Sequence, residues 1–322
     1  MIRLPIKPAA LALLIIFTPP AIQAQERNGT DRGFSCKIQG GAVYIQTNSQ
    51  LSTESANAQV SGLDGPAHTH EKTTGIASLY MNYRFDDGTA LYFGNPLEVG
   101  EGLSLKAGVS RPLKFLTLDV ALTYLPVGEV WKNPYQTNGV RQKSDIDVYG
   151  MEVQIKEIAD SPWELSYKID RVDISDDEIG AQEKDLDRSG QTHEVGLKYT
   201  MTYPSRLSVR PELSYTYANL NGPANRYEGL KLGVLLQQAR PPWVFIGVVS
   251  GFYNQYEKQH PLFGNRRQEE GLTTFAQVMR LNLFGSERLF ASVGAGYVWS
   301  NANIDFFDSQ TLIGLASAGL NF

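Results

Sequence analysis

The chain has 322 residues, a net charge of −5 and a single cysteine. These values exclude an internal disulfide and give no electrostatic basis for binding nucleic acid. Beyond residue 24 there is no apolar run long enough for a membrane-spanning helix. Short alternating stretches with 16 Tyr and 30 Gly favour an outer-membrane barrel over a periplasmic protein.

Residues 1–24 have the features of a secretory signal peptide. Arg3 and Lys7 supply the positive segment, Ala9 to Phe17 the apolar segment, and Ile22 to Ala24 a small-residue cleavage site. We expect residues 25–33 to be a polar periplasmic lead-in and residues 34–322 to form the barrel. Cys36 lacks the context of a lipidated N-terminus, and we expect it to be inert.

Strict period-two alternation is the main structural signal of the remaining chain. Between Leu207 and Ala218, apolar residues at odd positions alternate with polar residues at even positions. The pattern predicts strands with one face in lipid, and aromatic residues near the segment ends fit the interfacial girdles of a barrel.

Fourteen such segments predict an all-β, transmembrane, antiparallel up-and-down barrel with alternating short and long connections. Twelve strands remain an alternative if residues 75–94 do not span. The predicted strands are 34–47, 75–85, 89–94, 102–111, 114–125, 144–157, 162–173, 190–203, 206–218, 227–238, 243–255, 271–284, 287–299 and 310–322.

Two segments are ambiguous in their orientation. In 243–255 both faces are apolar, so the inward face is not assigned. In 271–284 we place Leu281 and Leu283 toward lipid, which puts Gln277 on the apolar face and Arg280 in the lumen.

The last segment, Thr311 to Phe322, alternates and ends on an aromatic residue. We expect it to pair with the first strand and to present the C-terminal signal that the outer-membrane assembly machinery reads.

Charged residues on the expected inner face are the candidates for lining a pore. Both signs occur, so the lumen is either a weakly selective channel or a core closed by ion pairs. The candidates are Arg84, Lys106, Asp119, Glu152, Lys168, Glu194, Lys198, Arg210, Glu212, Lys231 and Arg280.

Three loop features could bind partners, and each has a simpler interpretation. Trp131 and Tyr135 could contact a sugar or fold into the pore, or they could anchor and pack the loop. The acidic stretch from Asp170 to Asp187 could hold Ca²⁺ against lipopolysaccharide, but solvated charge is favoured. His68 and His70 lack a third metal ligand nearby.

No catalytic motif stands out. The chain has no G-x-S-x-G elbow, H-E-x-x-H motif or phosphate loop, so we expect no enzyme, cofactor or metal. A hydrolase site at the barrel rim stays the least favoured alternative.

Short motifs along the chain resemble an outer-membrane family known as domain of unknown function 2860. The resemblance implies a barrel in the outer membrane and supplies no site residues. At Lys132 and Asn133 the family pattern would have an acidic pair. The matching stretches are Gly33 to Ser35, Tyr92 to Glu98, Gly108 to Ser110, Glu129 to Tyr135, Arg141 with Ser144 and Asp145, Tyr149 with Gly150, and Ser300 to Asp308.

The sequence therefore predicts an outer-membrane barrel, favoured as a porin-like channel for small polar solutes. The alternative is a structural or surface-interaction barrel with a closed lumen. The expected surroundings are the lipid bilayer and lipopolysaccharide.

Overall fold

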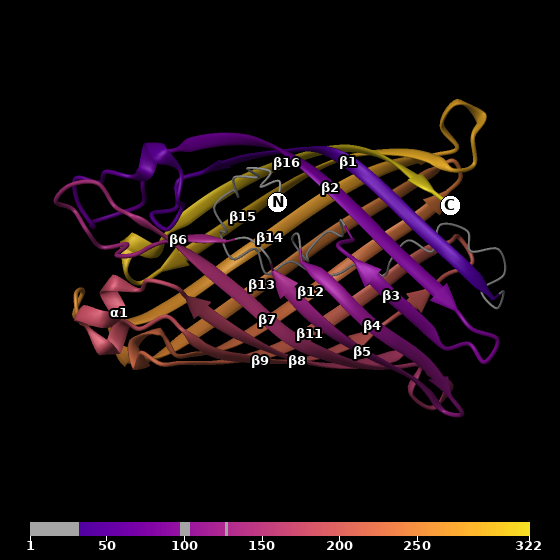
Figure 1. The fold of residues 1–322 in the computed structure, drawn as a ribbon, viewed down its shortest axis with the longest axis horizontal. Coiled ribbons are helices and arrows are strands. Elements are labelled where there is room, and N and C mark those ends of the chain that lie inside the picture. Colours follow the sequence, from indigo (N-terminus) through magenta and orange to yellow (C-terminus); the bar gives the residue numbers. More distant parts are fainter. Residues whose placement is uncertain (1–31, 97–103, 126–127) are drawn as a thin grey trace, which may run out of the picture.

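The computed structural model describes residues 32–96, 104–125 and 128–322, and within them the chain forms a closed antiparallel β-barrel (Figure 1). Each strand pairs with its neighbours in sequence, and the last strand, β16, closes on β1. In that seam Lys37 to Thr47 pair with Asn321 to Thr311. The signal peptide and most of the lead-in lie outside the described residues.

Fourteen strands make up the wall, with β9 and β10 counted as two parts of one strand. The short strand β6 pairs only with β7, inside a loop. The bounds are β1 Gly33–Thr47, β2 His70–Arg84, β3 Ala90–Gly94, β4 Leu105–Leu113, β5 Leu116–Leu125, β6 Glu129–Trp131, β7 Lys143–Lys156, β8 Trp163–Ile174, β9 Gly190–Tyr199, β10 Met201–Thr202, β11 Leu207–Leu220, β12 Tyr227–Arg240, β13 Trp243–Gln259, β14 Arg266–Leu281, β15 Leu289–Ala302 and β16 Ser309–Asn321.

The fourteen-strand prediction is confirmed, and the twelve-strand alternative is wrong. The short β3 is part of the wall, because it pairs with both β2 and β4. Several strands extend further toward the loops than predicted. For example, β13 runs to Gln259, since its polar end lies beyond the alternating apolar part.

The outer face carries an apolar belt. Leu122, Leu232 and Val293 are each about 60% exposed, at 64%, 59% and 61%. Exposed apolar side chains are stable in the hydrocarbon of a membrane, whereas their contact with water would cost free energy. Aromatic residues flank the belt near the strand ends, as Trp163, Trp243 and Phe322 do. The barrel therefore spans a membrane.

The two ends of the barrel differ, and we call them the turn end and the loop end. Short connections join the strands at the turn end, where β1 begins and β16 ends. Longer connections gather at the other end, together with α1 (Figure 1). The helix α1 is Glu178–Gln182, and the 3₁₀ segments are Ser55–Asn57, Ile158–Asp160, Lys184–Leu186, Pro223–Asn225, Leu283–Gly285 and Asp305–Phe307.

None of the helices described is long and apolar enough to cross a bilayer.

One strand is oriented opposite to the prediction. In β14, Gln277 and Met279 are buried on the inner face, and Arg280 is exposed on the outer face. Arg280 lies 5.4 Å from the ring centre of Trp243, near the turn end. Period-two alternation separates two faces, but it cannot tell inside from outside when both faces are apolar.

Candidate functional site

The inner face of the barrel carries a continuous stretch of charged side chains on adjacent strands. Cations and anions pair across them: Lys106 with Glu152 at 3.2 Å, Lys156 with Asp119 at 3.2 Å and Lys198 with Glu164 at 3.1 Å. We call this stretch the charged wall, and it comprises Lys106, Asp119, Glu152, Lys156, Glu164, Lys168, Asp170, Glu194, Lys198, Arg210 and Glu212.

Hydrogen bonds within the wall fix these charges further. Tyr92 donates its hydroxyl hydrogen to Asp119 Oδ1 at 2.6 Å. Lys168 pairs with Asp170 on its own strand at 2.8 Å. Hydrogen bonds between charged groups are short and strong, so they hold the paired side chains in place. Asp119, Lys198 and Arg210 are 7%, 6% and 4% exposed, so these charges are buried on the inner face of the barrel.

The opposite part of the inner face is apolar in its turn-end half. Two clusters of buried side chains form there on β12 to β15. We call them together the apolar wall, and its members are Leu235, Val244, Ile246, Val248, Phe275, Met279 and Phe290. This wall explains why the inner face of β13 has no polar signature in the sequence.

Inward aromatic rings lie along the wall, over glycines of the adjacent strand. A Cβ added at Gly294 or Gly296 would lie 2.7 Å from ring atoms of Phe275. The same relation holds between Phe290 and Gly319 and between Tyr92 and Gly108. Glycine weakens a strand unless a neighbouring group uses the space that it leaves. Here each ring occupies the space beside a glycine of the adjacent strand.

A second structure covers the loop end. Ten apolar side chains from six loops form one cluster, in which Leu186 is 0% and Phe306 1% exposed. We call this cluster the loop cap. Its members are Leu63, Tyr135, Ile179, Leu186, Ala224, Phe263, Ala302, Ile304, Phe306 and Phe307.

The loop cap crosses the mouth of the barrel. The rings of Tyr135 and Phe306 have centroids 5.1 Å apart. The loop of Tyr135 connects β5 to β7, and that of Phe306 connects β15 to β16. Six strands separate these loops along the shorter way around the barrel. Loops from nearly opposite sides therefore meet over the lumen.

His260 ties two loops of the cap together through its neutral ring. Its Nδ1 accepts the backbone N–H of Leu262 at 3.3 Å, so in the neutral ring Nε2 carries the hydrogen and donates it to the Tyr135 hydroxyl oxygen at 3.0 Å. Burial, with the nearby charge of Arg267, lowers the pKa of His260 to about 4. Burial also raises the pKa of Tyr135 to about 12. Both groups are therefore neutral near pH 7.

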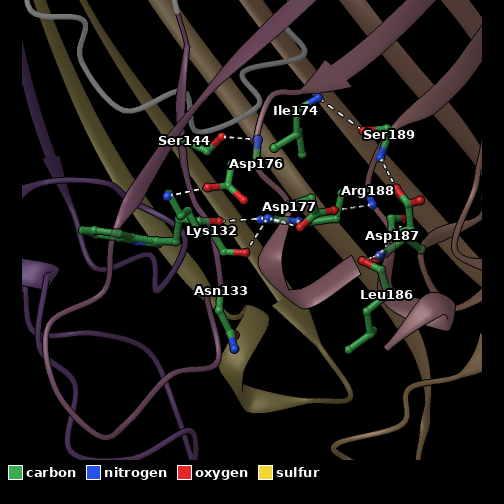
Figure 2. A network of polar contacts seen from close by, with 12 residues as sticks. Lys132, Asn133, Ser144, Ile174, Asp176, Asp177, Leu186, Asp187, Arg188 and Ser189 are labelled. Carbon is green, nitrogen blue, oxygen red and sulfur yellow. Dashed lines mark hydrogen bonds and ion pairs between the residues drawn. The ribbon is translucent and has the colours of Figure 1, made fainter. Parts of the chain in front are cut away.

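Arg188 joins the loop of Trp131 to the loop that holds α1 (Figure 2). Its Nε donates to Asp177 Oδ1 at 3.0 Å, and its backbone N–H donates to Asp177 Oδ2 at 2.9 Å. Its Nη2 donates to the carbonyls of Trp131 and Lys132 at 2.8 and 3.1 Å. Lys132 pairs with Asp176. A basic residue at position 132 thus has a partner in the acidic loop.

Arg141 anchors the first long loop in the same way. Its guanidinium donates to the carbonyls of Asn57, Gln50 and Pro134 at 3.1, 3.1 and 2.9 Å and lies over the Trp131 ring. Burial lowers the pKa of Arg141 to about 10. The cation is satisfied by carbonyl oxygens, which fixes the path of the loop.

The structure separates the candidate residues into three groups. Ten of the eleven pore-lining candidates lie on inward positions, and Arg280 is corrected to the outer face. Trp131 and Tyr135 are 1% and 9% exposed, so they pack within the loops and are not available as surface contacts. His70 bonds to Ser52 Oγ at 2.6 Å.

The acidic loop uses its carboxylates in ion pairs. Asp176, Asp177 and Asp185 pair with Lys132, Arg188 and Lys258. Among the described residues no group of three or more His, Cys, Asp or Glu side chains is arranged to hold a metal ion.

Sequence reasoning missed His260 and Arg267, because both are isolated charged or polar residues in or beside a loop. Arg267 lies 3.5 Å from the ring centre of Tyr256 and 3.9 Å from that of Phe307. The only signal in the sequence is the density of aromatic residues between Tyr256 and Phe307, which does not say which rings meet.

A family model described as "Protein of unknown function (DUF2860)" matches residues 33–322. The chain belongs to this family. The match covers every barrel strand and confirms the resemblance of the short motifs. No curated protein matches this DUF2860 member significantly.

Solved outer-membrane barrels are similar to this DUF2860 member at low identity. OmpT of Vibrio cholerae, expressed in the outer membrane, has a TM-score of 0.46 at 8% identity over 90% of this chain and 97% of that chain. A FadL homologue of Pseudomonas aeruginosa has a TM-score of 0.45 at 10% identity, covering 90% and 89%. An anion-selective porin from Comamonas acidovorans has a TM-score of 0.41 at 9% identity, covering 91% and 99%.

Proposed function

We propose that this protein is an outer-membrane channel that admits small polar solutes through a selective lumen. The observation that carries the proposal is the charged wall, in which ion pairs lie along strands from β4 to β11. Charged side chains of both signs along one side of a lumen are the kind of surface that lines the path of a hydrated solute.

The inward aromatic rings lie close to the backbone of adjacent strands. Phe275, Phe290 and Tyr92 lie over glycines of adjacent strands, so their bulk is kept against the wall. Phe290 and Phe275 are only 1% and 8% exposed, so other side chains cover these rings, which favours the closed-lumen alternative at this level.

The loop cap makes the channel narrow at its outer mouth. The contact between Tyr135 and Phe306 spans the opening, so solutes pass between the loops or when the loops move apart. This cap also supports a second candidate function, a structural or surface-interaction barrel whose lumen is closed.

Conductance in planar bilayers separates these two functions. We expect the purified protein in KCl to give discrete current steps, and the double variant Tyr135→Ala/Phe306→Ala to give larger or more frequent ones. The control is Val140→Ala, a residue of the same loop as Tyr135 that is 58% exposed. Circular dichroism checks that each variant is folded.

If neither the wild type nor the double variant gives current steps, the channel is contradicted and the closed barrel is favoured. Steps from the double variant alone would support a channel that the cap holds shut.

The proposal includes the setting of the barrel. The protein is exported by its signal peptide, is inserted by the outer-membrane assembly machinery through the strand that ends in Phe322, and lies beside lipopolysaccharide. It is not an enzyme. A screen for turnover of ester and lipid substrates tests that last statement, and hydrolysis by the purified barrel would contradict it.

A further inference from the structure

Three residues form one row on the outer face of the barrel, at the turn end of β12, β13 and β14. Arg240 pairs with Trp243, and Trp243 pairs with Arg280. Residues that pair directly across adjacent strands point to the same side of the sheet, and all three are exposed on the outer side. The two arginines therefore flank one indole ring. We call these three residues the arginine row.

The arginine row lies at the edge of the apolar belt. Two residues further along each strand toward the loop end, the outward positions are Phe245, Val278 and Val293. Phe245 and Val293 are 42% and 61% exposed. Tryptophan is favoured at the boundary between hydrocarbon and headgroups. The guanidinium groups therefore lie at the depth of the lipid headgroups.

No carboxylate of the described residues neutralises this row. Within the described part of the chain, neither Arg240 nor Arg280 forms an ion pair, even with Glu287 of the following turn. A third cation lies close by, because the Ala239 N–H donates to the Arg206 carbonyl at 3.1 Å. Cations at the edge of hydrocarbon are stabilised by a counter-charge, which here comes from outside the chain. The outward neighbours of the row are Gln238, Phe245, Val278 and Ala291.

The stacking of Arg280 suits it to bind a phosphate. Its guanidinium lies over the Trp243 ring, 5.4 Å from the ring centre. A guanidinium that lies on an aromatic face keeps its N–H groups available, and its planar fork matches two oxygens of one phosphate. The ring therefore holds the cation in place without using its hydrogen-bond donors.

The loop ends of the same two strands carry the opposite charge. Glu228 of β12 and Glu270 of β14 are exposed at outward positions. Each strand thus has a carboxylate at one membrane surface and an arginine at the other. Either sign would keep a strand end in water, so this difference indicates that the turn-end surface meets anions.

A groove in the outer wall lies further into the apolar belt. Its floor is a row of small residues, Gly247, Ala276 and Ala295, which pair in register on β13, β14 and β15. Leu236 and Tyr297 are among the residues that line it, and its volume is about 480 Å³. The floor is four residues along each strand from the arginine row, roughly 13 Å. An acyl chain attached to a phosphate at the row can reach it.

We propose that the arginine row binds the phosphate of an anionic phospholipid in the turn-end leaflet, and that an acyl chain of this lipid lies in the groove. Arg240 and Arg280 neutralise the phosphate. The lipid carries a net negative charge, because the guanidinium groups repel the ammonium of a zwitterionic headgroup. This site does not depend on whether the lumen conducts.

Native mass spectrometry of the purified barrel in detergent measures lipid binding. The probes are dioleoylphosphatidylglycerol and dioleoylphosphatidylcholine, which have the same acyl chains. We expect the first to bind more tightly, by about fivefold for each arginine of the row, as for basic residues at an anionic membrane surface. The variant Arg240→Gln/Arg280→Gln should lose this preference.

The matched control is Arg111→Gln/Lys114→Gln, which removes the same charge from the turn end of β4. Arg111 interacts electrostatically with the Asp87 carboxylate, and Lys114 lies over the Phe115 ring, so the preference should be retained. Circular dichroism checks that each variant is folded.

A second variant, Ala276→Leu/Ala295→Leu, fills the groove and leaves the arginine row unchanged. It should weaken the binding of both lipids and keep their ratio. Equal affinity of the wild type for the two lipids would overturn the inference, and so would an equal loss of preference in the control. A dimer that the groove variant abolishes, without any lipid preference, would assign this face to a second copy of the chain and also overturn it.

Discussion

The ring of Tyr135 lies 5.1 Å from the ring of Phe306, although their loops leave the barrel on nearly opposite sides. This contact joins the two halves of the mouth. His260 holds the Tyr135 hydroxyl, and Phe263 and Phe307 pack around the same centre. The cap is therefore one cooperative unit, and a substitution in one of its loops should also destabilise the others.

Acid should loosen the cap through His260. In the folded cap its pKa is about 4, and its ordinary value is 6.5. The folded pKa is the lower one, so the stabilisation is complete above about pH 6.5. It is lost as the pH falls toward 4, by about 3 kcal/mol at most. Protonation of Nδ1 would also break its bond with the Leu262 N–H.

Channel recordings between pH 7 and pH 4 measure this effect. Opening should become more frequent with acid in the wild type and in His68→Gln, a control at an exposed position in another loop. His260→Gln should show a much flatter pH profile. An unchanged profile in His260→Gln would assign the acid response to other groups.

The stability of the loop that contains α1 should depend on Asp177 and not on Asp176. The Asp177 side chain is 10% exposed and accepts three hydrogen bonds from Arg188. That of Asp176 is 54% exposed. Removing one partner of a buried pair leaves the other charge unsatisfied and costs about 3–5 kcal/mol, whereas an exposed pair contributes about 0–1 kcal/mol.

Limited proteolysis of barrels in vesicles compares Asp177→Asn with Asp176→Asn. We expect several-fold faster cleavage in residues 175–189 for Asp177→Asn only. Equal rates for the two variants would mean that Arg188 is not what holds this loop.

The ion selectivity should change when Arg210 is replaced and stay the same when Arg280 is replaced. Arg210 is 4% exposed on the inner face, and Arg280 lies on the outer face beside Trp243. Replacing Arg210 by Gln should raise the K⁺/Cl⁻ permeability ratio about twofold to fourfold, the effect of one unit charge roughly 10 Å from the path.

Reversal potentials in a KCl gradient measure the ratio, and Arg280→Gln is the matched control. A shift in Arg280→Gln as large as that in Arg210→Gln would contradict the orientation of β14.

Gly294 should control the width of the lumen through Phe275. A Cβ at Gly294 would lie 2.7 Å from Phe275 Cζ, so Gly294→Ala should push the ring toward the axis, at a cost of about 1–3 kcal/mol. Single-channel conductance should fall. The double variant Gly294→Ala/Phe275→Ala should recover it. Recovery is the decisive result, because a general loss of stability would not be reversed by a second truncation.

The sequence by itself determined the wall of the barrel. A strand with one face in hydrocarbon must alternate, and the segment from Leu207 to Ala218 alternates throughout. The strand number, the short and long connections and the positions of Lys198 and Arg210 follow from that period. These features are local, because each strand is read from its own residues.

Only the tertiary structure decided the orientation of β14 and the contacts of the loop cap. When both faces of a strand are apolar, the local pattern is the same whichever face is inside, and Arg280 lies outside only because the paired register of the barrel places it there. Tyr135 and His260 are 125 residues apart in the chain. Loops have no period, so their meeting depends on the circumference of a closed fourteen-stranded wall, which brings opposite loops within reach of each other.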